Sequence, residues 1–234
     1  MSLVVAIDGP AASGKSTMAK ILAKRLGLVH IDTGAMYRAI THLVLKEGKD
    51  PKNEEEACSV LDHVNLELTI DGKVFINGED VTRIIREGPV TNNVSYIASY
   101  KKIRLFLVEL QRKMSKDLSV VMDGRDIGTY VLPDADVKIF QIASVETRAL
   151  RRYKENEEKG IKSGELSEIE EVIRKRDYID SHRDFAPLKP ASDSVVLDTS
   201  NLSIEEAAEK CVNIIKEKLI KDGKNDLLSL DNEE

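Results

Sequence analysis

The stretch GPAASGKST, residues 9–17, lies between the apolar run LVVAID and a segment of helical period. Two glycines, a lysine and three hydroxyl groups at such a junction fit either a phosphate site or an ordinary strand-to-helix turn. The stretch fills every fixed position of the pattern G-x-x-x-x-G-K-[S/T], and it follows a strand and precedes a helix, as a phosphate-binding loop requires. The context therefore favours the phosphate site.

In such a loop, successive backbone N–H groups point inward, and the positive end of the following helix dipole adds to their field. Lys15 can then span the β- and γ-phosphates, while Ser16 offers a hydroxyl to Mg²⁺. Asp123 ends the apolar run LSVVMD and is the candidate second partner of the metal, direct or in its outer shell, and the alternative is a capping residue for the next turn. We expect ATP to be bound by Gly9, Pro10, Ala11, Ala12, Ser13, Gly14, Lys15, Ser16 and Thr17.

Apolar runs rich in Val and Ile alternate with segments of helical period along the chain. The runs lie at 3–8, 28–31, 118–123, 136–142 and 194–198, and the helical segments at 15–26, 35–47, 145–159 and 204–220. Unbroken apolar strands between helices predict an α/β fold with a five-stranded parallel sheet covered by helices on both faces. The dipeptides Asp71-Gly72 and Asn77-Gly78 predict a small antiparallel insert at 64–80.

Composition excludes several classes of protein. The net charge of −6 and the absence of Trp argue against a protein that coats nucleic acid, and the apolar runs are too short to span a membrane. Cys58 and Cys211 stand far apart, and the four histidines are scattered, so a zinc cluster is not indicated. We expect a cytoplasmic monomer whose partners are small-molecule nucleotides rather than nucleic acid or membrane.

A nucleotide site alone does not distinguish a kinase from a GTP-hydrolysing switch. A guanine-reading switch needs an Asn-Lys-x-Asp element, which the sequence lacks. A kinase needs arginines near the strand ends, because two polyphosphates must be held together against their repulsion. Arg38 follows Asp-Thr-Gly with Tyr37, in the expected first turn of a helix, and Arg125 lies in DGRDIGT. These arginines favour the kinase.

The motifs DGPAASGKST, DTGAMYR, DGRDIGTYVLPDADVKIF and RDYIDSHRDFAPLKPA occur in this order. Through them the chain, from about residue 3 to 220, resembles the bacterial cytidylate kinases of the nucleoside monophosphate kinase family. The resemblance implies transfer of the γ-phosphoryl group of ATP to CMP, and to dCMP, with Mg²⁺. A UMP or dephospho-coenzyme A kinase on the same scaffold is the alternative, and a regulatory NTPase is a more distant one.

The resemblance also implies roles for individual residues. The acceptor pocket would comprise Thr33, Tyr37, Arg38 and Arg125, and the cytosine edge would meet Ser95, Arg104 and Asp126. The pentose and phosphates would contact Arg176, Asp180 and Arg183, and the donor phosphates Arg148, Arg151 and Arg152. The expected catalytic set is Lys15, Arg38, Arg125, Arg148 and Arg152, and the expected metal partners are Ser16 and Asp123.

We expect one kinase domain at 1–221. Within it, the core would comprise 1–38, 98–150 and 187–221, and the monophosphate-binding region with its insert 39–97. The charged segment 151–186 fits either a solvated helical hairpin or a lid that is mobile around Gly160 to Gly164. Residues 222–234 are expected to form a flexible acidic tail.

Overall fold

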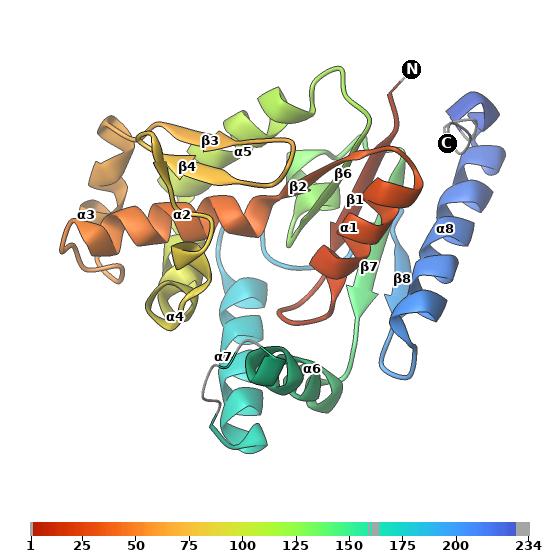
Figure 1. Ribbon diagram of the computed structural model, residues 1–234. Helices are drawn as coiled ribbons and strands as arrows, with labels where there is room; N and C mark the ends of the chain where they lie inside the picture. Colours follow the sequence, from red (N-terminus) through yellow and green to blue (C-terminus); the bar gives the residue numbers. More distant parts are fainter. Residues whose placement is uncertain (1, 159, 161–163, 228–234) are drawn as a thin grey trace.

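Residues 2–158, 160 and 164–227 are described in the computed structural model (Figure 1). In this part of the chain, five parallel strands form one sheet in the order β2-β6-β1-β7-β8. The strands are β1 (Val4–Asp8), β2 (Val29–Asp32), β6 (Val120–Gly124), β7 (Val137–Ile142) and β8 (Val195–Asp198). The predicted α/β fold with its five-stranded parallel sheet is confirmed.

Helices cover both faces of this sheet, as expected for strands that are apolar throughout. On one face α1 (Lys15–Arg25) and α8 (Ile204–Lys221) pack on β1 and β7 around Leu22 and Cys211. On the other face α5 (Lys101–Ser115) contributes Val108 to a core with Met122 of β6. Because the five strands are parallel, their carboxyl ends lie at the same end of the sheet. There Asp8 pairs in register with Gly124, and Asp32 with Asp123.

A second unit extends from the β2 end of the sheet (Figure 1). It has its own core, built mainly by α2 (Thr33–Lys46) and α4 (Gly88–Ile97). The predicted antiparallel insert is confirmed as a sheet of β3 (Leu66–Leu68), β4 (Val74–Ile76) and β5 (Glu79–Asp80), in this order, with Asp71-Gly72 and Asn77-Gly78 at its turns. The remaining elements of the unit are α3 (Glu54–Ser59), η1 (Val60–Asp62) and η2 (Ile84–Arg86).

The start of α2 differs from the sequence prediction. The carboxylate of Asp32 accepts the N–H of Ala35, and this cap lets the helix begin at Thr33 despite Gly34. Tyr37 and Arg38 consequently lie in the second helical turn rather than the first. They still follow directly from the carboxyl end of β2.

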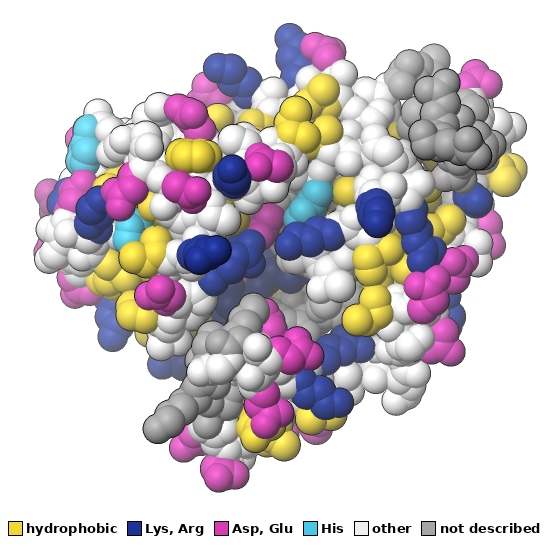
Figure 2. Space-filling model, in the orientation of Figure 1, with side chains coloured by type: hydrophobic (Ala, Val, Ile, Leu, Met, Phe, Trp, Pro, Cys, Tyr) yellow, Lys and Arg dark blue, Asp and Glu magenta, His cyan; other side chains and the backbone are white. Residues whose placement is uncertain are grey.

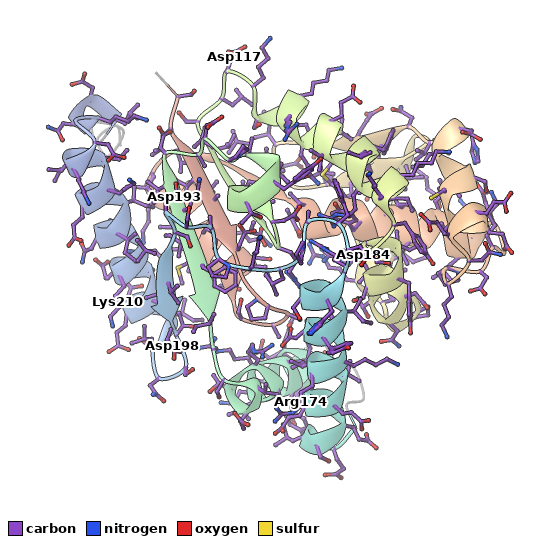
Figure 3. All side chains as sticks on the ribbon, turned by 180° about the vertical axis from the view of Figure 1, so that it is seen from behind. Asp117, Arg174, Asp184, Asp193, Asp198 and Lys210 are labelled. Carbon is purple, nitrogen blue, oxygen red and sulfur yellow. The ribbon has the colours of Figure 1, made fainter. Side chains whose placement is uncertain are left out.

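The charged segment after β7 forms two packed helices, α6 (Val145–Glu158) and α7 (Leu166–His182). Arg174 of α7, labelled in Figure 3, reaches Glu146 of α6 at 3.4 Å. The expected mobile stretch around Gly160 to Gly164 includes 161–163, which lie outside the described residues. The division into core, monophosphate-binding region and lid remains a prediction.

Two residues of the predicted tail are packed against the domain. Lys224 forms an ion pair with Asp136, and Leu227 is only 6% exposed because its side chain completes the core under α8. Residues 222–227 are thus packed against the domain, while 228–234 lie outside the described part of the chain. Among the described residues, we find no helix with the length and apolar character to cross a membrane.

Candidate active site

The phosphate-binding loop packs tightly against β7. A Cβ atom added to Gly9 would lie 2.1 Å from the backbone oxygen of Gln141, so only glycine fits at this approach. The side-chain amide of Gln141 donates to Ser13 O at 2.6 Å, and Gly14 enters α1 with a φ of 91°. Gln141 of β7 therefore contacts the loop both near its start, at Gly9, and near its end, at Ser13.

Lys15 is the buried cation of this loop. Its Nζ donates to Pro10 O at 3.1 Å, and the side chain is largely enclosed. Burial, together with nearby Arg125, lowers the pKa of Lys15 to about 7. A bound polyphosphate would place negative charge beside Lys15 and so favour the charged form of its side chain.

Ser16 and Asp123 meet at the start of α1. The Ser16 hydroxyl donates to Asp123 Oδ2 at 2.5 Å, and Thr33 Oγ1 donates to the backbone oxygen of Asp123 at 2.7 Å. A hydroxyl and a carboxylate are hard oxygen ligands that suit Mg²⁺, which is usually held by one or two carboxylates plus phosphates and water. No group of three His, Cys, Asp or Glu side chains that could hold a metal ion occurs among the described residues.

Arg38 projects from α2 toward the carboxyl end of β2. Its Nη2 lies 3.0 Å from Asp32 Oδ2, and Nη2 of Arg86 lies 3.6 Å from the same oxygen. Burial opposes ionisation of Asp32, but Arg38 and Arg86 outweigh it and hold the pKa of Asp32 at about 2. Two guanidinium groups therefore share one carboxylate beside the loop.

The DGRD turn connects β6 to the π-helical turn η3 (Ile127–Val131) and faces α7. Arg125 Nε donates to Asp180 Oδ2 at 2.8 Å. Arg176 lies nearby with a buried Nε that has no hydrogen-bond partner, and burial together with Arg125 lowers its pKa to about 10. An excess of guanidinium over carboxylate in a buried place is suited to an anion.

Asp126, the next residue, lies between two buried arginines. Arg104 Nη2 is 2.5 Å from Asp126 Oδ2, and Arg183 Nη2 is 3.3 Å from Oδ1. The ring of Tyr37 lies 5.4 Å from the Arg104 guanidinium. The structure thus brings Arg104, Asp126 and Tyr37 together, whereas buried Ser95 has no hydrogen bond to this group.

The arginines of α6 behave differently from one another. Arg148 is buried and donates to Ala11 O at 3.0 Å and to Asp177 at 2.6 Å, and Arg151 donates to Ser13 O at 3.1 Å. Both therefore touch the phosphate loop. Arg152 is about one-third exposed, 3.7 Å from Glu155 of its own helix, and its role at the donor phosphates stays a prediction.

These cations form one cluster. Arg125 and Arg176 both act on the pKa of Lys15, while Arg38 and Arg152 act on that of Arg176. Figure 2 shows Lys and Arg side chains gathered around a hollow near the middle of this face. Charges drawn from the loop, α2, the DGRD turn and α7 thus converge where two anionic ligands could meet.

Comparison with known proteins assigns this arrangement to a family. The family model described as cytidylate kinase matches residues 5–217. The chain belongs to the cytidylate kinase family. It is 50% identical over 214 residues to the cytidylate kinase of Bacillus cereus (strain B4264), covering 90% of this chain and 95% of that protein. It is 51% identical over 216 residues to the cytidylate kinase of Oceanobacillus iheyensis, covering 91% and 94%.

A solved structure of an uncharacterized protein from Eubacterium ventriosum ATCC 27560 superposes on this member of the cytidylate kinase family with a TM-score of 0.52. The match covers 92% of this chain and 99% of that one at 14% sequence identity. At this identity the likeness supports the fold alone.

Four residues of the site were missed by sequence reasoning: Asp8, His30, Arg86 and Asp177. Asp8 accepts the N–H groups of Ile127 and Gly128, both at 2.8 Å, and so ties β1 to η3, directly after the DGRD turn of this cytidylate kinase family member. The position of Asp8 at the end of an apolar strand could have marked it as a site residue. Asp177 accepts the N–H of Ala11 at 3.2 Å, and its position beside Arg176 in the RDYID motif could have marked it too.

Proposed function

We propose that the chain transfers the γ-phosphoryl group of ATP to CMP, and also to dCMP, to give ADP and the nucleoside diphosphate. The observation that carries this proposal is the convergence of Lys15, Arg38 and Arg125 on one edge of the sheet in a member of the cytidylate kinase family. The DGRD turn and the antiparallel insert favour CMP over the acceptors of other kinases built on the same scaffold.

On the donor side, the loop 9–17 would bind the ATP phosphates through its N–H groups and Lys15. Arg148 and Arg151 already donate to backbone oxygens of this loop, which supports a role for both at the donor phosphates. Arg152 would join them from the same helix. Mg²⁺, when bound, would neutralise charge on the phosphates, with Ser16 and Asp123 as its protein partners.

On the acceptor side, Arg38 and Arg125 would hold the phosphate of CMP, with Thr33 and Tyr37 lining the pocket. Each guanidinium is now paired with a carboxylate, Arg38 with Asp32 and Arg125 with Asp180, and this pairing keeps it oriented until the anion arrives. Arg176, Asp180 and Arg183 would serve the pentose and phosphates. Ser95, Arg104 and Asp126 would contact the polar edge of cytosine.

The reaction needs positioning and charge neutralisation more than covalent help from the protein. In phosphoryl transfer the charge lies on the equatorial oxygens of a loose transition state, which buried cations stabilise. No general base is required, because the attacking phosphate oxygen of CMP is already anionic near neutral pH. Closure of the site around both nucleotides would keep water from competing as the acceptor.

The test is a coupled assay of ADP release with ATP and, separately, CMP, dCMP, UMP, AMP or no acceptor. We expect CMP and dCMP to be phosphorylated with kcat/KM at least about 100-fold above AMP, because unpaired polar groups penalise a mismatched base. Faster turnover of UMP or AMP would contradict the choice of acceptor. ADP release that is independent of any acceptor would instead indicate a hydrolase.

A further inference from the structure

His30 lies against the carboxylate that faces Ser16. Its Nε2 is 2.7 Å from Asp123 Oδ1, while the Ser16 hydroxyl donates to Oδ2 of the same group. The three side chains thus form a chain from β2 through β6 to the first turn of α1. His30 and Asp123 are 93 residues apart in the sequence.

The directions of these hydrogen bonds follow from the chemistry of the groups. An ionised carboxylate only accepts, so the His30 Nε2 carries the proton in this contact. The His30 side chain is 14% exposed and that of Asp123 is 3% exposed, so water competes little for either group. His30 therefore occupies Oδ1 and leaves Oδ2 directed at Ser16.

The backbone near Asp123 is independently fixed. Asp32 and Asp123 are partners in the parallel register, and Thr33 Oγ1 holds the backbone oxygen of Asp123. What remains free is rotation of the Asp123 carboxylate about its own side-chain bonds, and the His30 contact restricts that rotation. Groups that orient a metal ligand in this way affect metal affinity about 10- to 100-fold when removed.

We propose that His30 is a positioning residue, which orients Asp123 so that Oδ2 and the Ser16 hydroxyl together receive the Mg²⁺ that accompanies the nucleotide. This inference rests on the proposed function, since it assumes that Ser16 and Asp123 are the metal partners. It adds a residue from β2 to a site otherwise formed by the loop and β6.

The test measures ADP binding by calorimetry with and without Mg²⁺, so that the ratio of the two affinities isolates the contribution of the metal. In His30→Phe, which keeps a ring but removes the donor, we expect this ratio to fall about 10-fold while Mg²⁺-free ADP binding changes less than about threefold. His30→Gln, which retains a donor, should recover part of the ratio. His30→Leu provides a second variant should Phe fold poorly.

The matched control is His63→Phe. His63 Nε2 also lies 2.7 Å from a carboxylate oxygen, that of Glu47, but His63 is about half-exposed and the pair lies outside the site. Its substitution should leave the ratio unchanged. An unchanged ratio in His30→Phe, or an equal loss of affinity with and without Mg²⁺, would overturn the inference. Failure of the proposed function would appear separately, as no CMP-dependent ADP release by the unsubstituted protein.

Discussion

Arg104 Nη2 lies 2.5 Å from Asp126 Oδ2, and neither side chain is more than 5% exposed. Arg183 approaches the other oxygen of the same carboxylate at 3.3 Å. The residue proposed to read cytosine is therefore also the counter-ion of two buried arginines. Substituting it should affect both stability and recognition, and the two effects have to be measured separately.

Asp126→Asn tests both roles. Losing one partner of a buried ion pair costs about 3–5 kcal/mol, so urea unfolding should show a loss of this order. Below the unfolding temperature of the variant, the KM for CMP should rise at least about 10-fold and that for ATP less than twofold. Asp184→Asn, at the exposed carboxylate labelled in Figure 3, is the control. An unchanged KM for CMP would remove Asp126 from base recognition.

Lys15→Met separates catalysis from folding. Removing a cation that neutralises charge in the transition state should lower kcat about 100- to 1,000-fold. Stability should not fall, because burial already disfavours the charged form of Lys15. We would measure turnover and the thermal midpoint beside Lys20→Met, an exposed lysine of the same helix. Near-normal turnover would contradict the phosphate role.

Local signals made the fold and much of the site predictable. The spacing of Gly9, Gly14 and Lys15 by itself indicates a phosphate-binding loop. The apolar runs predict where the strands lie, although they do not show which strands pair. Turn dipeptides located the insert in the same way. Each of these features depends on residues close together in the sequence.

The missed features depend on partners far along the chain. Asp8 and Ile127 are 119 residues apart, and no periodicity states which carboxylate will meet which amide. His30 looks like one polar residue in a short strand until β2 and β6 are paired. Leu227 was overlooked because the three leucines of the polar, acidic stretch 221–234 are too few to give a periodic signal, although Leu227 belongs to the core.

Gly9→Ala tests whether the loop path depends on its approach to β7. The added methyl would meet the backbone oxygen of Gln141, which cannot move without disturbing the sheet. We expect a loss of about 1–3 kcal/mol in stability, as for other overpacked sites, and ADP binding weakened at least about 10-fold. Gly88→Ala is the control, since it has open space around it and begins α4. Similar ADP affinity in both variants would contradict the prediction.

The raised pKa of Asp8 predicts the sign of a pH dependence in stability. Burial raises its pKa from 3.8 to about 7, against the opposing amide hydrogen bonds from Gly128 and Ile127. Between about pH 4 and 7 the folded protein therefore holds a proton on Asp8 that the unfolded chain has released. The contribution of Asp8 to stability should fall across this window as pH rises, by up to about 1.4 kcal/mol per pH unit.

Asp8→Asn removes this titration while keeping the side chain close to its original size. The measurement is urea unfolding from pH 4 to 8 for both proteins, and the relevant quantity is the unfolding free energy of the unsubstituted protein minus that of the variant. This difference should decline with pH and flatten toward pH 8, because Asp8 is then largely ionised in both the folded and the unfolded state. Titratable groups that do not interact with Asp8 cancel in the subtraction, whereas Asp126 and Lys15, which both act on the pKa of Asp8, contribute to the difference. A difference that stays flat, or rises with pH, would mean that the amide hydrogen bonds outweigh burial at Asp8.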